Sequence, residues 1–119
     1  MSTLEGAVTS GRLPIKESGR TVFVQLDEVE YFEASGNYVR VHAGEAHYRV
    51  REKLSTMETR LPERDFVRIH RSVIVNVGRI KNLESDAHGE YVITLRDGVR
   101  LQSGRTYSGR LRGFINNPF

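Results

Sequence analysis

The chain of 119 residues contains no cysteine. It therefore cannot form a disulfide framework, a thiol nucleophile or a thiolate metal site. No apolar run approaches the roughly 20 residues that a membrane-spanning helix requires, and residues 1–12 lack the basic and apolar regions of a secretion signal. We expect a soluble domain that works in the cytoplasm and has no contact with a membrane.

Patterns typical of catalysis and of metal binding are missing as well. The four histidines are His42, His47, His70 and His88. They fall on different expected strands or turns, and none of them shows ligand spacing such as H-x-x-x-H. There is no convergent pair of carboxylates, and Gly104 and Gly109 lack the spacing of a phosphate-binding loop. We therefore expect no enzyme activity, no cofactor and no metal ion.

Positive charge gathers in the second half of the chain. Residues 1–65 carry 9 basic and 11 acidic residues, a net charge of −2, whereas residues 66–119 carry 9 and 4, a net charge of +5. Of the 18 basic residues 15 are arginine, whose planar fork suits phosphates and guanine edges. A basic patch indicates nucleic-acid binding, although a solvated surface rich in arginine would give the same composition.

The segment Phe66–Leu83, with the sequence FVRIHRSVIVNVGRIKNL, organises the rest of the chain. Apolar and polar residues alternate up to His70, as they do in a half-buried strand. The alternation breaks at Arg71-Ser72 and resumes as an almost continuous apolar run, Val73–Val75. We therefore expect a turn between two strands with Arg71 near its tip, followed by a second turn at Asn76–Gly78.

Short alternating segments of this kind fill most of the chain and predict a mostly β fold. The expected strands lie at about 13–16, 21–24, 30–34, 38–42, 47–51, 66–70, 73–75, 80–85, 91–95 and 99–102. The predicted fold class is a compact domain of short antiparallel strands in small packed sheets with one amphipathic helix. Residues 1–12 are expected to be a disordered leader or the remnant of a linker, and residues 13–119 the domain itself.

Helical spacing is clear in only one place. Val50, Leu54, Met57 and Leu61 follow one another at intervals of four, three and four residues, which predicts an amphipathic helix over about 52–61. A proline directly after it ends the helix. Its charges have mixed sign, so we expect it to cover a sheet rather than to contact phosphates. The segment Ser108–Phe114 could add a terminal turn or two.

Three polar tips carry the side chains that could recognise DNA: Ser35–Tyr38, Arg71-Ser72 and Ser103–Tyr107, called the first, second and third tip below. Arginine pairs with guanine and asparagine with adenine through bidentate hydrogen bonds, while hydroxyl groups suit phosphates. Asn37 and Ser103 are also ordinary turn residues beside a glycine, so alone they do not indicate function. Nothing about a turn requires a long cation, which makes Arg71 the stronger candidate.

Four motifs, in this order along the chain, resemble those of the LytTR family of bacterial DNA-binding domains. They are EYFEASGNYVRVH at Glu30–His42, VREKLSTMETRL at Val50–Leu61, FVRIHRSVIVNVGRI at Phe66–Ile80 and LQSGRTY at Leu101–Tyr107. The resemblance extends over about residues 13–114. It implies a set of small packed sheets in which loops, and not a helix, enter the grooves of DNA.

The resemblance also implies which residues contact DNA. The matching positions are Asn37, Tyr38, Arg71, Ser72 and Arg105, with Ser103 and Tyr107 as weaker candidates. Relatives often carry a larger and frequently basic residue where this chain has Gly104, which leaves the contact strength or the base preference of the third tip open. His70 matches the second motif too, but its alternation with Arg68 favours a structural, hydrogen-bonded role.

The sequence thus predicts a domain that binds double-stranded DNA sequence-specifically and acts in bacterial transcription regulation. The resemblance implies that two copies bind direct repeats. It also implies that a receiver domain precedes this segment, which would then be the output domain of a two-component response regulator. A second interpretation stays open: a β-rich protein-interaction module whose basic face meets an acidic partner. The salt dependence of binding to duplex DNA would separate the two.

Overall fold

The computed structural model describes residues 3–4 and 11–115 of the chain. The strands in this part are β1 (Thr3–Leu4), β2 (Arg12–Glu17), β3 (Arg20–Gln25), β4 (Tyr31–Ser35), β5 (Tyr38–Ala43), β6 (Ala46–Val50), β7 (Phe66–His70), β8 (Val73–Asn76), β9 (Ile80–Ser85), β10 (Tyr91–Leu95) and β11 (Arg100–Gln102). The helices are η1 (Leu26–Glu28), α1 (Leu54–Arg60), η2 (Val77–Arg79), η3 (Arg105–Tyr107) and α2 (Ser108–Ile115).

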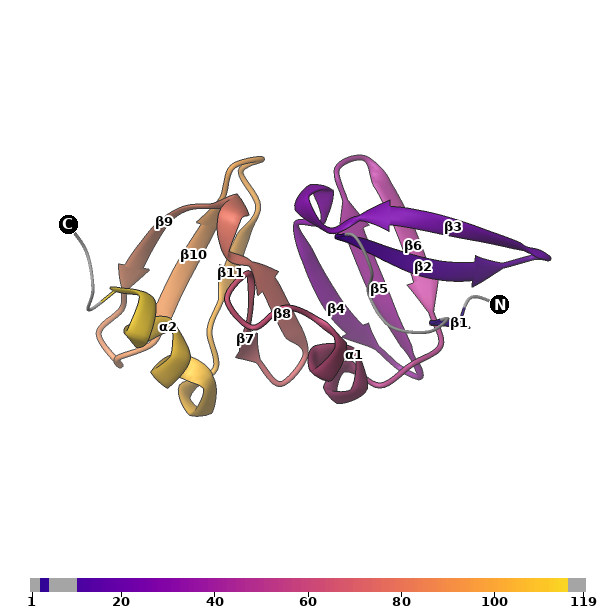
Figure 1. Cartoon of the computed structure of the whole chain (residues 1–119). Helices are drawn as coiled ribbons and strands as arrows, with labels where there is room; N and C mark the ends of the chain where they lie inside the picture. The colour runs from indigo at the N-terminus through magenta and orange to yellow at the C-terminus, as the bar shows by residue number, and fades with distance from the viewer. Residues whose placement is uncertain (1–2, 5–10, 116–119) are drawn as a thin grey trace.

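The strands form three antiparallel sheets, as Figure 1 shows. One three-stranded sheet has the order β1–β2–β3, and a second has the order β11–β10–β9. Between them lies a five-stranded sheet, the central sheet, with the order β6–β5–β4–β8–β7. The predicted fold class of short antiparallel strands in small packed sheets is confirmed.

The central sheet is buried on both faces where β8 runs through it. Ile74 belongs to one hydrophobic core, while Val73 and Val75 belong to a second core on the opposite face. Because successive side chains of a strand point to opposite faces, a strand between two cores must be apolar at every position. This requirement explains the unbroken apolar run that follows the second tip.

The first core lies between the central sheet, the β2–β3 hairpin and α1. Its fully buried side chains include Leu13, Phe32 and Met57, one from each of these three parts. Helix α1 lies inside the range of 52–61 predicted for it, and Leu61 is buried directly after its last residue. The helix therefore covers a sheet face, as its amphipathic spacing predicts.

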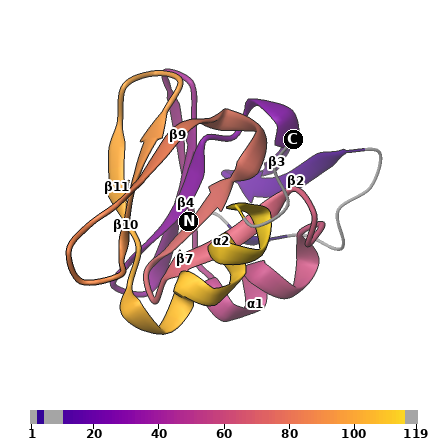
Figure 2. The same ribbon diagram turned by 90° about the vertical axis from the view of Figure 1, so that its left-hand side faces the viewer.

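The second core lies between β7, β8, the β9–β10–β11 sheet and α2. Val67, Ile93 and Leu111 are buried in it, one each from β7, β10 and α2. Figures 1 and 2 show α1 and α2 at the same end of the molecule. Arg110 Nη1 of α2 lies 3.9 Å from Glu58 Oε2 of α1. The second helix occupies the segment for which the sequence indicated a terminal turn or two, and its eight residues make about two turns.

The predicted leader is only partly covered by the described residues. Residues 1–2 and 5–10 lie outside them, but Thr3 and Leu4 pair with Lys16 and Ile15 as strand β1. The prediction of disorder is wrong for these two residues. The outer edge of β2 offers unpaired backbone N–H and C=O groups, and a neighbouring segment of chain satisfies them. Strand β2 also begins one residue before the predicted domain boundary.

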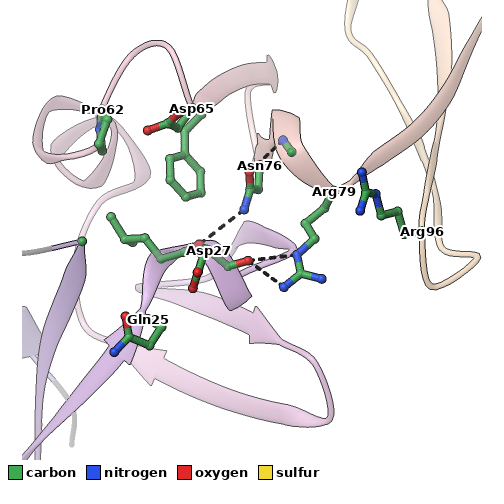
Figure 3. A pocket seen from close by; sticks show the side chains of 11 residues that line it. Gln25, Asp27, Pro62, Asp65, Asn76, Arg79 and Arg96 are labelled. Carbon is green, nitrogen blue, oxygen red and sulfur yellow. Dashed lines mark hydrogen bonds between the residues drawn. The ribbon is translucent and has the colours of Figure 1, made fainter.

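The end of β8 and the following η2 are tied to the β3–β4 connection by polar contacts, which Figure 3 shows; those of Asn76 are buried and those of Arg79 are exposed. Asn76 donates from Nδ2 to the carbonyls of Leu26 and Val29 at 3.3 and 2.8 Å. Arg79 donates from Nε and Nη2 to the carbonyl of Asp27 at 3.0 and 2.6 Å. These bonds fix the end of β8 that lies opposite the second tip, so the tip stands on a strand that is held at its far end.

Among the described residues, no helix is long and apolar enough to span a lipid bilayer.

Candidate nucleic-acid interface

The first tip is a two-residue turn between β4 and β5. Ser35 pairs with Tyr38, so Gly36 and Asn37 form the turn itself. Gly36 has a φ of +61°, a backbone conformation that residues with a side chain rarely adopt, so glycine suits this position of the turn. Asn37, the other residue of the turn, is exposed. The Tyr38 ring is half-buried because the guanidinium of Arg49 lies 4.2 Å from its centroid. Asn37 is therefore open to a ligand, whereas the Tyr38 ring is partly covered by Arg49.

The second tip joins β7 to β8, as predicted, and Arg71 is exposed on it. Ser72 is half-buried. Its Oγ lies 2.8 Å from His70 Nδ1, and its backbone N–H donates to the same nitrogen at 3.1 Å. This confirms the hydrogen-bonded position predicted for His70. The bonds hold the turn in one conformation while leaving the Arg71 side chain outside it.

The third tip connects β11 to α2, and it does not expose every residue that was nominated there. Ser103 is only 1% exposed, and its Oγ accepts a hydrogen bond from the N–H of Tyr91 at 2.9 Å. Ser103 therefore lies inside the protein, where its hydroxyl serves as the acceptor for an N–H of the neighbouring strand β10. Arg105, by contrast, has a side chain that is 82% exposed, with Nε 4.0 Å from Glu90 Oε1. Arg105 is the group that this tip offers to a ligand.

Gly104 brings the third tip into direct contact with the second. Its N–H donates to the carbonyl of Ile69 at 2.7 Å. A Cβ built on Gly104 would lie 3.2 Å from His70 Cδ2, tighter than ordinary contact. The glycine at this position thus permits a close contact, because a Cβ here would require the His70 ring or the third tip to shift by a few tenths of an ångström.

The three tips lie side by side along one edge of the molecule, the lower edge in Figure 1. The first and second tips are joined by a hydrogen bond from the N–H of Ala34 to the carbonyl of Ser72 at 2.8 Å. The second and third are joined through Gly104 and Ile69. Arg71 is therefore on the middle tip, with Asn37 and Arg105 on either side of it.

A hollow of about 630 Å³ opens between the first and second tips. Its lining includes Asn37 and Arg71, together with Arg51, Lys53 and Ser55 from the segment that leads into α1. Neither Lys53 nor Ser55 could be identified from the sequence as a candidate DNA contact. Both residues belong to a motif that was assigned to the helix, and only the fold brings the start of that helix beside the tips.

The outer face of β4–β5–β6 continues away from the first tip and is partly aromatic. The Tyr31 and His42 rings stack at 4.0 Å, the His42 and His47 rings meet edge to face at 5.0 Å, and His42 Nε2 lies 3.2 Å from Glu33 Oε1. Partial burial lowers the pKa of His42 below its usual 6.5, although the contact with Glu33 opposes this shift. His42 is therefore mainly neutral at neutral pH.

Metal binding has no candidate in the part of the chain that the structure describes: no group of three or more His, Asp or Glu side chains lies close enough together to hold an ion.

Comparisons with known proteins point to one family. The model of the LytTr DNA-binding domain matches residues 19–116. The sensory transduction protein LytT of Bacillus subtilis is 28% identical over 105 residues, which cover 88% of this chain and 44% of that protein. The CO-responsive transcriptional regulator RcoM of Rhodospirillum rubrum is 32% identical over 105 residues, which cover 87% of this chain and 44% of that protein.

A solved structure, the LytTr DNA-binding domain of a response regulator from Bacillus cereus, superposes with a TM-score of 0.80 at 28% identity. The match covers 92% of this chain and all of that one. The chain therefore spans less than half the length of the curated relatives above but the whole of the solved domain.

Proposed function

Since this chain belongs to the family of LytTr DNA-binding domains, we propose that it recognises a specific duplex sequence through Asn37, Arg71 and Arg105 on its three tips. One observation carries the proposal. Three polar tips from separate hairpins and connections stand on one edge, and backbone hydrogen bonds join each to the next. Recognition of base edges requires donors held at fixed positions, and a rigid edge of this kind provides them.

The remaining candidates take supporting roles in this proposal. We assign the hydroxyls of the half-buried Tyr38 and Tyr107 to phosphate contacts beside the tips. Ser72 holds the second tip through His70 and can offer its hydroxyl at the surface. Ser103 is buried, so we leave it out of the contact set and assign it to the support of the third tip.

The domain is proposed to act as the DNA-binding part of a longer transcription regulator in the bacterial cytoplasm. The relatives LytT and RcoM are more than twice as long as the segment that matches. A receiver domain in the rest of the protein, and two copies of the domain on direct repeats, are the arrangement that the family resemblance favours. Recognition through surface arginines needs no enzymatic step and no cofactor.

A random-duplex selection identifies the preferred site, and four variants then test the tips. A bidentate contact to a base is worth roughly 1–3 kcal/mol of discrimination, or about 5- to 150-fold. Arg71→Ala and Arg105→Ala should therefore reduce the ratio of specific to scrambled affinity by amounts in this range. The measurement is that ratio for each variant at one fixed salt concentration.

Arg49→Ala and Arg51→Ala are the comparison variants, because Arg49 packs on the Tyr38 ring and Arg51 lines the hollow, so both lie beside the tips without being on one. They should leave the ratio nearly unchanged and at most reduce the salt dependence of binding. If the tip variants keep the wild-type ratio while the comparison variants lose it, recognition through the tips is wrong.

The other candidate function, a basic face for an acidic protein partner, makes a different prediction. Such a module would enrich no sequence in the selection. It would also bind scrambled and selected duplexes equally, with a salt dependence that reflects charge alone.

A further inference from the structure

Arg68 of β7 directs its guanidinium group mainly to acceptors within the protein, although the residue also lines the hollow between the first and second tips. Its Nε donates to the carbonyl of His70 at 3.2 Å, and its Nη2 donates to the carbonyl of Arg71. Its Nη1 donates to Glu58 Oε1 of α1 at 3.0 Å. The side chain is only 13% exposed, although the residue lies three positions from the second tip. All three nitrogens of the fork are thus occupied by acceptors of this chain.

The backbone around Arg68 explains why the second tip needs the hydrogen bonds that Arg68 donates to it. The pairing of β7 with β8 shifts register between Arg68 and His70, which is the mark of a β-bulge. A bulge interrupts the regular ladder of hydrogen bonds and leaves backbone groups without their usual partner. The planar fork of arginine can reach two successive carbonyls at once, which the single ammonium of lysine cannot do in a fixed geometry.

The same guanidinium also touches the third tip. Its central carbon lies 5.3 Å from the centroid of the Tyr107 ring in η3. Its acidic partner, Glu58, receives a second cation, because Arg110 Nη1 of α2 lies 3.9 Å from Glu58 Oε2. One arginine therefore connects the second tip, the third tip and α1, and through Glu58 it also connects to α2.

We propose that Arg68 is a positioning residue, which sets the orientation of Arg71 relative to Arg105 and so determines specificity without contacting DNA. The inference rests on the proposed function of the tips. A guanidinium that is already neutralised by Glu58 and bonded to two carbonyls has little left to offer a phosphate. Its loss would let the second tip move, and a small displacement is enough to break a bidentate contact to a base.

Two variants test this role without removing the bulk of the side chain. Arg68→Lys keeps the charge but loses the fork. Glu58→Gln keeps Arg68 and removes its acidic partner. We expect each to lower the ratio of specific to scrambled affinity by roughly tenfold, which corresponds to about 1.4 kcal/mol, and to leave the salt dependence of binding at its wild-type slope.

Glu58→Gln is the more decisive of the two variants, because charge alone and the positioning role predict different outcomes for it. It removes a negative charge from the DNA-binding edge, so simple electrostatics predicts tighter binding to every duplex. A fall in specificity from this change would therefore come from the loss of the bond that Glu58 makes to Arg68. Glu45→Gln, at an exposed site on the β5–β6 turn, controls for the loss of one anion and should not alter the ratio. Thermal unfolding checks that each variant is folded, and Glu58→Gln decides the outcome if Arg68→Lys unfolds early.

Two results would overturn the proposal. One is that both variants retain the wild-type ratio. The other is that Arg68→Lys weakens binding to all duplexes equally with a shallower salt slope, which is the behaviour of a phosphate contact. Arg71→Ala, measured in parallel, separates this failure from a failure of the proposed function. If Arg71→Ala flattens the ratio and the Arg68 and Glu58 variants do not, only the positioning role is wrong.

Discussion

Individual arginines of this domain differ in what holds their guanidinium groups. Arg68 and Arg79 donate to main-chain carbonyls of the protein, whereas Arg71 and Arg105 extend from tips. Sequence alternation identifies the face on which a side chain lies, but it does not identify the acceptors that folding brings there. Arg71 could therefore be nominated from its position at a break in alternation, while the role of Arg68 required the positions of α1 and η3.

Ser103 is the opposite case: the sequence nominated it as a DNA contact, and the fold buries it. A serine beside a glycine in a turn is usually exposed, and the resemblance strengthened its nomination as a DNA contact. The structure buries it because the N–H of Tyr91, on the neighbouring strand, takes its hydroxyl as an acceptor. This pairing depends on the register of two segments twelve residues apart, which a local pattern does not encode.

His42 makes the stability of the domain depend on pH. Burial lowers its folded-state pKa below the unfolded value of 6.5, so the unfolded chain binds a proton more readily. The contribution of neutral His42 to stability is complete above pH 6.5 and is lost as the pH falls through the folded-state pKa. We expect the wild-type melting temperature to decline below pH 6.5 more steeply than that of His42→Gln, measured by thermal unfolding between about pH 5 and 8.

The charged neighbours of His42 define the controls for this measurement. Glu33 favours the protonated form, while His47 and Arg40 disfavour it. Glu33→Gln should therefore steepen the decline, since it removes the group that opposes the shift. His88→Gln changes a histidine in an exposed turn and should follow the wild-type curve. Parallel curves for the wild type and His42→Gln would show that burial of His42 has no such effect.

The two helices were predicted unequally well because they are stabilised in different ways. Helix α1 shows apolar residues at regular helical spacing, and its position follows from that pattern. Helix α2 has the sequence SGRLRGFI, in which two glycines disfavour a helix and only one fully buried apolar residue, Leu111, marks a core face. Its existence depends on the second core and on tertiary bonds such as that from Arg110 to the carbonyl of Glu63.

We expect helix α1 to support the fold and not to read base edges, which Leu61→Ala can test. Leu61 is 6% exposed in the first core, directly after the helix. Truncating a buried leucine typically costs about 2–5 kcal/mol, a large share of the stability of a small domain. The melting temperature should fall markedly. The ratio of specific to scrambled affinity, measured at a temperature where the variant is folded, should equal that of the wild type.

Thr59→Ala, at an exposed position of α1, serves as the control and should change neither quantity appreciably. The assignment of the helix would be wrong if Leu61→Ala kept its full melting temperature and nevertheless lost DNA affinity. Glu58 is unsuitable for this comparison, because its carboxylate holds Arg68.

At the scale of the whole molecule, the domain consists of two cores that share the central sheet. Its extents of 48 × 30 × 25 Å show an elongated body, and the tips occupy one long edge in Figure 1. The class of fold could be predicted from short alternating segments and turns. The pairing of β4 with β8 could not, because it joins segments about forty residues apart, and such contacts depend on both cores together.

The surface of the described residues favours a monomer in solution. The large apolar side chains exposed there are Phe23 at 51% and Phe114 at 41%, and they lie on β3 and α2, at opposite ends of the molecule in Figure 1. A stable protein–protein interface generally buries about 1,600 Å² with a well-packed apolar centre. Two isolated aromatic side chains do not form such a centre.

The free domain should therefore sediment as a monomer at micromolar concentration. On a duplex with two copies of the selected site as a direct repeat, two domains should bind, whereas a duplex with one copy should bind one. In the proposed binding mode each copy uses the edge that carries the tips for DNA, so we expect pairing to arise from the spacing of the sites and not from association beforehand. Sedimentation of the domain alone and with the two duplexes measures all three states. A stable dimer of the free domain would contradict this prediction, and a single domain on the repeat duplex would show that the two sites are not occupied together.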